Sequence, residues 1–382
     1  METEKLYYQD AFLREFSAKV LTCEPAKTGY LVTLDRTAFY PEGGGQPADH
    51  GTLNNIAVTD VHERDGIIVH NVDEKVEIGE TVTGKLDWPR RFDHMQQHSG
   101  EHIISGILCR DYHCDNVGFH LGSDTVTIDY NADITWEQVL DAERQANEII
   151  WADQAVEIQY PSREELASID YRSKKELLGQ VRIVTFPHAD CCACCGTHVL
   201  RAGQVGLVKV LSCQKFRDGV RIEILCGQRA TAFLGTVYDQ NRGIAQRLSV
   251  KVQDTLSAVE RVESELTAAK ARMTELEEQV IAGIAAQCQG KGDTLLIRHD
   301  LRPDAVRKLA DAVAKVCGGL SAVFCGADQR YQYALVRADG QDISPLVQKL
   351  NQTLQGRGGG RNGFAQGQVQ ATESQIQEFM KL

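Results

Sequence analysis

The chain contains no apolar run that approaches the ~20 residues of a membrane-spanning helix. It shows no basic segment followed by an apolar stretch at its start, so we expect no secretory signal. None of its glycine-rich segments ends in Gly-Lys-Ser or Gly-Lys-Thr, which excludes a P-loop for phosphate binding. We therefore expect a protein of the reducing cytoplasm, whose twelve cysteines are free or bound to metal instead of paired in disulfides.

The charge is acidic as a whole but uneven along the chain. The net charge is −12 over 382 residues, which argues against a nonspecific nucleic-acid binder. Residues 291–382 nevertheless carry 12 Lys and Arg against 9 Asp and Glu. This mildly basic C-terminal part permits contact with a nucleic acid through a local surface.

The local patterns predict an α+β protein with several domains. Residues 1–88 are β-rich, and helical and strand patterns mix over 89–238. A coiled-coil-like helical linker is expected over 239–290 and a small α/β domain over 291–382.

Individual elements are predicted where the pattern is regular. In the first 238 residues, strands are expected at 30–34, 67–70, 81–86, 125–130 and 181–186, a hairpin at 206–211 and 219–225, and helices at 91–109 and 135–152. Thr135 is the predicted N-cap of the last of these helices. In the C-terminal domain, strands are expected at 294–297, 321–325 and 333–337, and helices at 303–316 and 343–353.

A heptad repeat runs over residues 245–280. One seam contains Val252, Val259, Leu266, Met273 and Val280, and a second contains Thr255, Val262, Ala269 and Leu276. The pattern predicts a coiled-coil-like helix that serves as a spacer or as a dimerisation seam.

Two short motifs supply metal-ligating side chains at equal spacing. The first is His98-Ser-Gly-Glu-His102 and the second is Cys194-Cys-Gly-Thr-His198. If both are helical, each pair lies on one helix face. Three imidazoles and one thiolate suit Zn²⁺ better than Mg²⁺ or Ca²⁺. Four protein ligands alone favour a structural site, and Cys195 stands beside Cys194 as a competing thiol.

Glu101 allows another interpretation of the first motif. His98-x-x-Glu101-His102 matches the inverted zinc-peptidase pattern, in which the glutamate acts as general base. That pattern needs a downstream carboxylate ligand and leaves Cys194 and His198 unexplained. Otherwise Glu101 is a helix surface residue or a partner of a metal ligand.

Two glycine-rich segments allow a structural and a functional interpretation. The segment from Tyr40 to Gln46 is a tight loop, or else a wall over a substrate pocket in which Gln46 or backbone N–H groups donate hydrogen bonds. Residues 356–367 form a linker, or else place Arg357 and Arg361 against an RNA backbone with Phe364 beside them.

Together these motifs resemble the freestanding alanyl-tRNA editing proteins, the AlaX group in its long form, and the editing and C-terminal domains of alanyl-tRNA synthetase. The segment 37–46, both metal motifs, the run 118–122 and the ending 358–367 carry the resemblance, which covers nearly the whole chain. The family usually has Cys-Gly-Gly-Thr-His, whereas Cys195 replaces the first glycine here.

The resemblance implies a β-barrel-like N-terminal domain, a zinc editing domain and a C-terminal tRNA-binding-like domain. It implies hydrolysis of tRNA(Ala) mischarged with Ser or Gly, without ATP and without aminoacylation. An alanine site cannot strongly reject an amino acid that merely adds a hydroxyl, so a second hydrolytic check is needed. One Zn²⁺ per chain would be held by His98, His102, Cys194 and His198.

The resemblance also implies roles for further residues. Thr37, Gly43, Gly44, Gly45 and Gln46 would line the pocket, with Thr37 and Gln46 recognising the serine hydroxyl. Glu101 and His120 are candidates for a general base or a partner of the metal ligands. Arg357, Arg361 and Phe364 would contact tRNA, and the helical or C-terminal region would support a homodimer in the cytoplasm. The alternatives are a zinc peptidase and a noncatalytic, zinc-stapled tRNA-binding protein.

Overall fold

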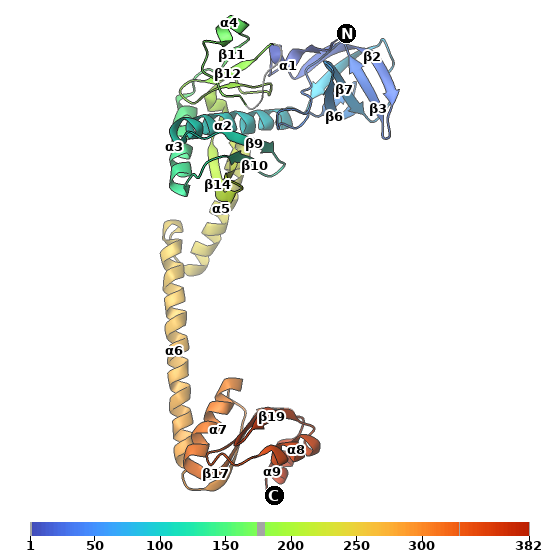
Figure 1. Ribbon diagram of the computed structural model, residues 1–382. Coiled ribbons are helices and arrows are strands. Elements are labelled where there is room, and N and C mark those ends of the chain that lie inside the picture. The colour runs from blue at the N-terminus through green and yellow to red at the C-terminus, as the bar shows by residue number, and fades with distance from the viewer. Residues whose placement is uncertain (1, 174–179, 328, 382) are drawn as a thin grey trace. The chain divides into compact units, whose positions relative to one another are not determined.

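The computed structural model describes residues 2–173, 180–327 and 329–381. It contains two compact units, Met1–Gly243 and Ile244–Leu382 (Figure 1). Helices and sheets occur in both units, so the predicted α+β class is confirmed. Among the described residues, no helix has the length and apolar character that crossing a bilayer requires.

The N-terminal part of the first unit is a closed barrel of six strands. Their order is β2-β3-β7-β6-β5-β8. Alternate residues of β2 (Glu15–Pro25), such as Phe16, Ala18 and Val20, face the barrel core. The other strands are β3 (Tyr30–Leu34), β5 (Gly51–Leu53), β6 (Ile56–Arg64), β7 (Ile67–Val72) and β8 (Thr81–Leu86). Three short elements lie outside the barrel's strand order: β1 (Glu4–Lys5), α1 (Leu6–Gln9) and β4 (Arg36–Thr37). Strands β1 and β4 pair with each other.

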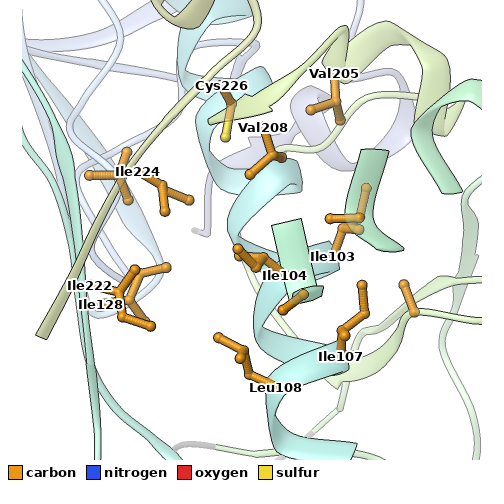
Figure 2. Close-up of a cluster of buried hydrophobic side chains, with 14 of the residues drawn as sticks. Ile103, Ile104, Ile107, Leu108, Ile128, Val205, Val208, Ile222, Ile224 and Cys226 are labelled. Atoms are coloured by element: carbon orange, nitrogen blue, oxygen red, sulfur yellow. The ribbon is translucent and has the colours of Figure 1, made fainter. Parts of the chain in front are cut away.

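Helix α2 (Trp88–Tyr112) is the central element of the rest of the unit. Asp87 caps it by accepting a hydrogen bond from the backbone N–H of Arg90 at 3.3 Å, and it ends at His113 in the left-handed region. Figure 2 shows Ile103, Ile104, Ile107 and Leu108 of α2 in the hydrophobic core. The facing residues are Ile128, Val205, Val208, Ile222, Ile224 and Cys226.

Two sheets, helix α3 and a 3₁₀ turn pack against α2. The predicted hairpin is confirmed as β14 (Val208–Phe216) and β15 (Gly219–Cys226). In the same sheet, β15 pairs with β10 (Val126–Tyr130), and β10 pairs with β9 (Asn116–Leu121). Helix α3 (Trp136–Ala152) has Thr135 as its N-cap, as predicted, in a capping box with Gln138. A second sheet contains β11 (Glu157–Gln159), β12 (Ile183–Phe186) and β13 (Asp190–Ala193). The remaining elements are α4 (Arg163–Leu166) and the 3₁₀ turn Ala202–Val205.

The predicted helix over 245–280 is present but interrupted, because the chain turns within it. Helix α5 (Gly227–Leu248) is followed by Ser249 with φ of +55° and by the 3₁₀ turn Val252–Asp254. Helix α6 (Thr255–Gln287) then carries the repeat, so Val252 lies outside it.

The second unit ends in a five-stranded sheet with helices. The strand order is β16-β17-β18-β20-β19. The glycine-rich ending, for which a linker was one interpretation, pairs as β19 and β20. The elements are β16 (Gly292–Arg298), α7 (Pro303–Cys317), β17 (Gly318–Ala327), β18 (Arg330–Arg337), α8 (Ser344–Thr353), β19 (Arg357–Arg361), β20 (Phe364–Val369) and α9 (Glu373–Phe379).

Candidate metal centre

The structure brings the two predicted metal motifs together. His98 and His102 lie one turn apart on α2, and Cys194 and His198 lie in the loop after β13. One ligand atom from each residue lies within 4.8 Å of those of the other three. The second motif is not helical. A turn at Gly196, whose N–H donates to Cys194 Sγ at 3.3 Å, places its two ligands instead.

The distances within the cluster fit a tetrahedral zinc ion. Cys194 Sγ lies 3.3 Å from His198 Nε2 and 3.6 Å from His98 Nε2. Zn–S and Zn–N bonds of ordinary length at a tetrahedral angle separate sulfur and nitrogen by about 3.6 Å. The donor set of three imidazoles and a thiol therefore matches one Zn²⁺.

A second side chain holds the other ring nitrogen of each imidazole. This contact fixes the ring so that Nε2 remains for a metal, as in most protein zinc sites. The partners of Nδ1 are Gln46 Oε1 for His98 (2.9 Å), Asp190 Oδ2 for His102 (2.8 Å) and Ser99 Oγ for His198 (3.2 Å).

Asp190 is the most strongly held of these partners. Its carboxylate is buried and accepts hydrogen bonds from Arg172 Nε at 2.7 Å and Nη2 at 2.9 Å. Burial acts to raise the pKa of the Asp190 carboxyl, but the hydrogen bonds from His102 and Arg172 outweigh it and lower the pKa. Asp190 therefore stays ionised and anchors His102. Sequence analysis missed it, and its only signal was its position next to the cysteine cluster.

Cys194 has the character of a ligand thiolate, whereas Cys195 lies outside the cluster. Burial acts to raise the pKa of Cys194, but electrostatic interactions with His98 and His198 outweigh it and hold the pKa well below its usual value. The thiolate is the form that binds metal. The Cys195 side chain is exposed.

The glycine-rich segment contacts the centre through Gln46. Gly43 and Gln46 exchange two backbone hydrogen bonds of 3.1 and 3.0 Å across a turn, in which Gly44 and Gly45 have φ of +62° and +86°. The Gln46 side chain is fully buried, and Nε2 donates to Thr197 Oγ1 at 2.8 Å. Because Oε1 also accepts from His98 Nδ1, Gln46 links the glycine-rich turn to the candidate metal centre. Its predicted recognition of a serine hydroxyl stays a prediction.

Gly196 is required by its contact with the same histidine. A Cβ atom at this position would lie 2.1 Å from His98 Cε1 and 3.1 Å from Gln46 Oε1. The ring of Phe119 stacks on His98, with the ring centroids 5.1 Å apart. His98 is therefore enclosed on several sides.

Thr37 is buried in the barrel and bonds to His70. The His70 ring bonds to the carbonyl oxygen of Val32 through Nδ1 at 3.1 Å, and burial lowers its pKa to about 4. Neutral His70 therefore accepts at Nε2 from the Thr37 hydroxyl, at 2.9 Å. The N–H of Phe39 donates to Thr37 Oγ1 at 3.1 Å. One acceptor position of the Thr37 hydroxyl remains.

Glu101 and His120 lie outside the four-ligand cluster. Glu101 is buried, and its Oε1 accepts hydrogen bonds from Ser105 at 2.7 Å and from Asn116. Ser105 in turn bonds to Tyr130 at 2.6 Å. His120 is exposed on β9. Glu101 therefore belongs to a buried hydrogen-bonded network with Ser105, Asn116 and Tyr130.

Family models match three segments of the chain. The model "tRNA synthetases class II (A)" matches residues 3–90, and the model "Threonyl and Alanyl tRNA synthetase second additional domain" matches 181–223, which includes Cys194 and His198. The DHHA1 domain matches residues 292–382. A curated relative, the alanyl-tRNA editing protein AlaX-L of Pyrococcus horikoshii, is 31% identical over 98% of this chain and 96% of that protein. The chain belongs to the alanyl-tRNA editing family.

Members of a second group are also similar to this editing-family chain. The alanine–tRNA ligases of Halorubrum lacusprofundi and Pyrococcus abyssi are 35% and 30% identical over 96% and 100% of it. The chain spans only 42% and 44% of the length of those ligases. The crystal structure of the C-Ala domain from Aquifex aeolicus alanyl-tRNA synthetase matches 24% of the chain and 94% of that domain, at 18% identity and a TM-score of 0.21.

The predicted tRNA-contacting residues of this family member lie in the second unit. Arg357 and Arg361 are exposed at the two ends of β19. Phe364 is half-buried, and the Arg307 guanidinium lies 4.7 Å from the centre of its ring. The two arginines therefore present charge at a sheet edge, whereas the Phe364 ring already has a cationic partner.

Proposed function

We propose that the chain is a trans-editing hydrolase that cleaves the aminoacyl ester of tRNA(Ala) mischarged with Ser or Gly. Membership of the family makes it an aminoacyl-tRNA deacylase. The observation that carries the finer proposal is the cluster of His98, His102, Cys194 and His198, whose three rings are each held at Nδ1.

The chemistry follows from this donor set. Zn²⁺ bound there would polarise the ester carbonyl or lower the pKa of a bound water. The contribution of the chain is orientation, because Gln46, Asp190 and Ser99 hold the imidazoles in one arrangement. Gly43, Gly44 and Gly45 would form the substrate-side wall beside Gln46. Arg357 and Arg361 would contact the tRNA, which is a cytoplasmic partner.

The two other interpretations have less support. A peptidase of the inverted type would need Glu101 as a base beside the metal, yet Oε1 of this carboxylate is held by Ser105 and Asn116. Cleavage of casein would reveal such an activity. A noncatalytic role would appear as binding of tRNA without deacylation.

Thr37 is our proposed reader of the serine hydroxyl. Because its own proton goes to His70, the remaining position on Oγ1 can only accept a hydrogen bond, which a serine hydroxyl can supply. Thr37→Val keeps the shape but removes the acceptor. We expect kcat/KM for Ser-tRNA(Ala) to fall about tenfold, and that for Gly-tRNA(Ala), which lacks the hydroxyl, to change much less. A deacylation panel with Ser-, Gly- and Ala-tRNA(Ala) measures this.

Thr37→Ser is the matched control, because it keeps the hydroxyl and should retain the preference for the seryl substrate. Equal losses on the seryl and glycyl substrates in Thr37→Val would contradict a role in recognising serine. If the wild-type chain deacylates none of the three substrates, the proposed function itself is wrong.

The exposed seam of α6 supports a homodimer. Val259, Leu266, Met273 and Val280 recur every seven residues and are 38–53% exposed. We expect Leu266→Glu to weaken self-association at micromolar concentration, measured by sedimentation, because it places a charge in the seam. Thr267→Glu adds the same charge beside the seam and is the control. A wild-type chain that is monomeric at every concentration would contradict the proposal.

A further inference from the structure

A cavity of about 410 Å³ lies in the first unit. Pro47 of the glycine-rich segment, Arg90 and His94 of α2, Ser123 and Arg229 are among its lining residues. These residues have no role in the function proposed above, so the cavity is a candidate for a separate binding site.

The cavity carries an unpaired positive charge. Arg229 is neutralised by Asp93, with Nη2 2.6 Å from Oδ2, and donates from Nη1 to the carbonyl oxygen of Gly122 at 2.7 Å. Arg90 donates from Nε to the carbonyl oxygen of Ala48 at 3.2 Å. Within the part of the chain that the structure describes, Arg90 forms no ion pair, so its two terminal NH₂ groups remain for a ligand. Such groups suit a phosphate, which accepts two parallel hydrogen bonds from a guanidinium.

His94 provides a second, independent indication of a ligand. Its side chain is 2% exposed, yet its Nδ1 has no hydrogen-bond partner among the described residues. Buried polar atoms are nearly always hydrogen-bonded, and an unsatisfied one is costly. Because His94 lines the cavity, a ligand oxygen there would supply the missing partner.

The position of the cavity indicates which phosphate it would bind. His94 precedes the metal ligand His98 by four residues on α2, which is one helical turn. Pro47 directly follows Gln46, which contacts His98. In a charged tRNA the aminoacyl ester and the nearest phosphodiester are attached to the same terminal ribose, so they too are close neighbours.

We infer that the Arg90–His94 cavity binds the last phosphodiester of the tRNA, on the 5′ side of the terminal adenosine, and thereby places the ester at the metal centre. This inference rests on the proposed function. Ser123, which also lines the cavity, adds a hydroxyl donor, and Arg229 holds the neighbouring Gly122 by donating to its carbonyl oxygen.

The test replaces that single phosphodiester in Ser-tRNA(Ala) with a methylphosphonate, which has no charge. For the wild-type chain, kcat/KM should fall about 10- to 100-fold, the range for one charge-assisted contact. In Arg90→Ala the normal substrate should already be slow, and the methylphosphonate should cause little further loss. His94→Phe, which removes the ring nitrogens, should likewise reduce the loss of kcat/KM that the methylphosphonate causes.

Two controls accompany this test. Arg144→Ala removes an equal charge from an exposed site on α3 and should keep the full methylphosphonate effect. Inorganic phosphate should inhibit the wild-type chain more than Arg90→Ala. Equal rates for the methylphosphonate and normal substrates would overturn the inference, and inhibition by inorganic phosphate in that case would assign the cavity to a free anion. Failure of the wild-type chain to hydrolyse the normal substrate would instead overturn the proposed function.

Discussion

Replacing His102 with alanine is expected to remove the metal and to reduce deacylation of Ser-tRNA(Ala) by at least about 100-fold. Loss of a partner that only orients a zinc ligand typically costs 10- to 100-fold in affinity or activity, so loss of the ligand itself should cost more. The substitution also leaves Asp190 with Arg172 as its remaining strong partner. Metal content by elemental analysis and single-turnover deacylation measure the two effects. Removing the metal with a chelator should reproduce the loss in the wild-type chain, and Zn²⁺ should restore activity there but not in His102→Ala.

His62→Ala is the matched control. His62 is an exposed histidine on β6 that pairs with Asp60, so its loss should change neither metal content nor rate. Unfolding of the first unit can be followed by tryptophan fluorescence, which shows whether His102→Ala still folds. A folded His102→Ala that deacylates at the wild-type rate would contradict the catalytic assignment of the cluster.

The four candidate metal ligands could be predicted from the sequence because their spacing is local. His98 and His102 need only one turn of helix, and the CxxxH motif needs only one turn of loop around Gly196. The partners of the imidazoles could not be predicted in the same way. Gln46 is 52 residues from His98, and Asp190 is 88 residues from His102. Such contacts depend on tertiary structure, which no local pattern encodes. For the same reason, the sequence pattern placed Gln46 in the substrate pocket and did not reveal its hydrogen bond to His98.

The fold shows the same division between local and long-range information. Alternating runs such as Tyr30–Leu34 and the cap at Thr135 are local signals, and the structure confirms both elements. The strand Arg357–Arg361 was missed because glycine has low strand propensity, and its pairing with β20 overrides that preference. The break between α5 and α6 was missed because the heptad pattern continues through Val252 without a proline or glycine.

Arg91 also gave no signal in the sequence, yet the structure buries it completely. Its guanidinium donates from Nε to Asp49 at 3.0 and 2.9 Å and from Nη1 to the carbonyl oxygen of Ala11 at 2.9 Å. Nη2 donates to the carbonyl oxygen of Ala38, and Asp49 accepts from the N–H of Tyr40 at 2.6 Å. One side chain of α2 therefore holds the segment that leads into the glycine-rich turn, and through it the position of Gln46.

Arg91→Ala is accordingly expected to destabilise the first unit by about 3–5 kcal/mol, because it leaves the Asp49 carboxylate buried without a counter-charge. All three tryptophans, Trp88, Trp136 and Trp151, lie in this unit, so fluorescence during urea unfolding follows it without the second unit. Arg144→Ala, which breaks only exposed pairs with Asp141 and Glu148, should lower the free energy of unfolding far less than Arg91→Ala does. Replacing both buried partners, as in Arg91→Met with Asp49→Leu, should recover part of the loss because no lone charge remains. A destabilisation by Arg91→Ala no larger than that of Arg144→Ala would show that the buried pair does not hold the barrel to α2.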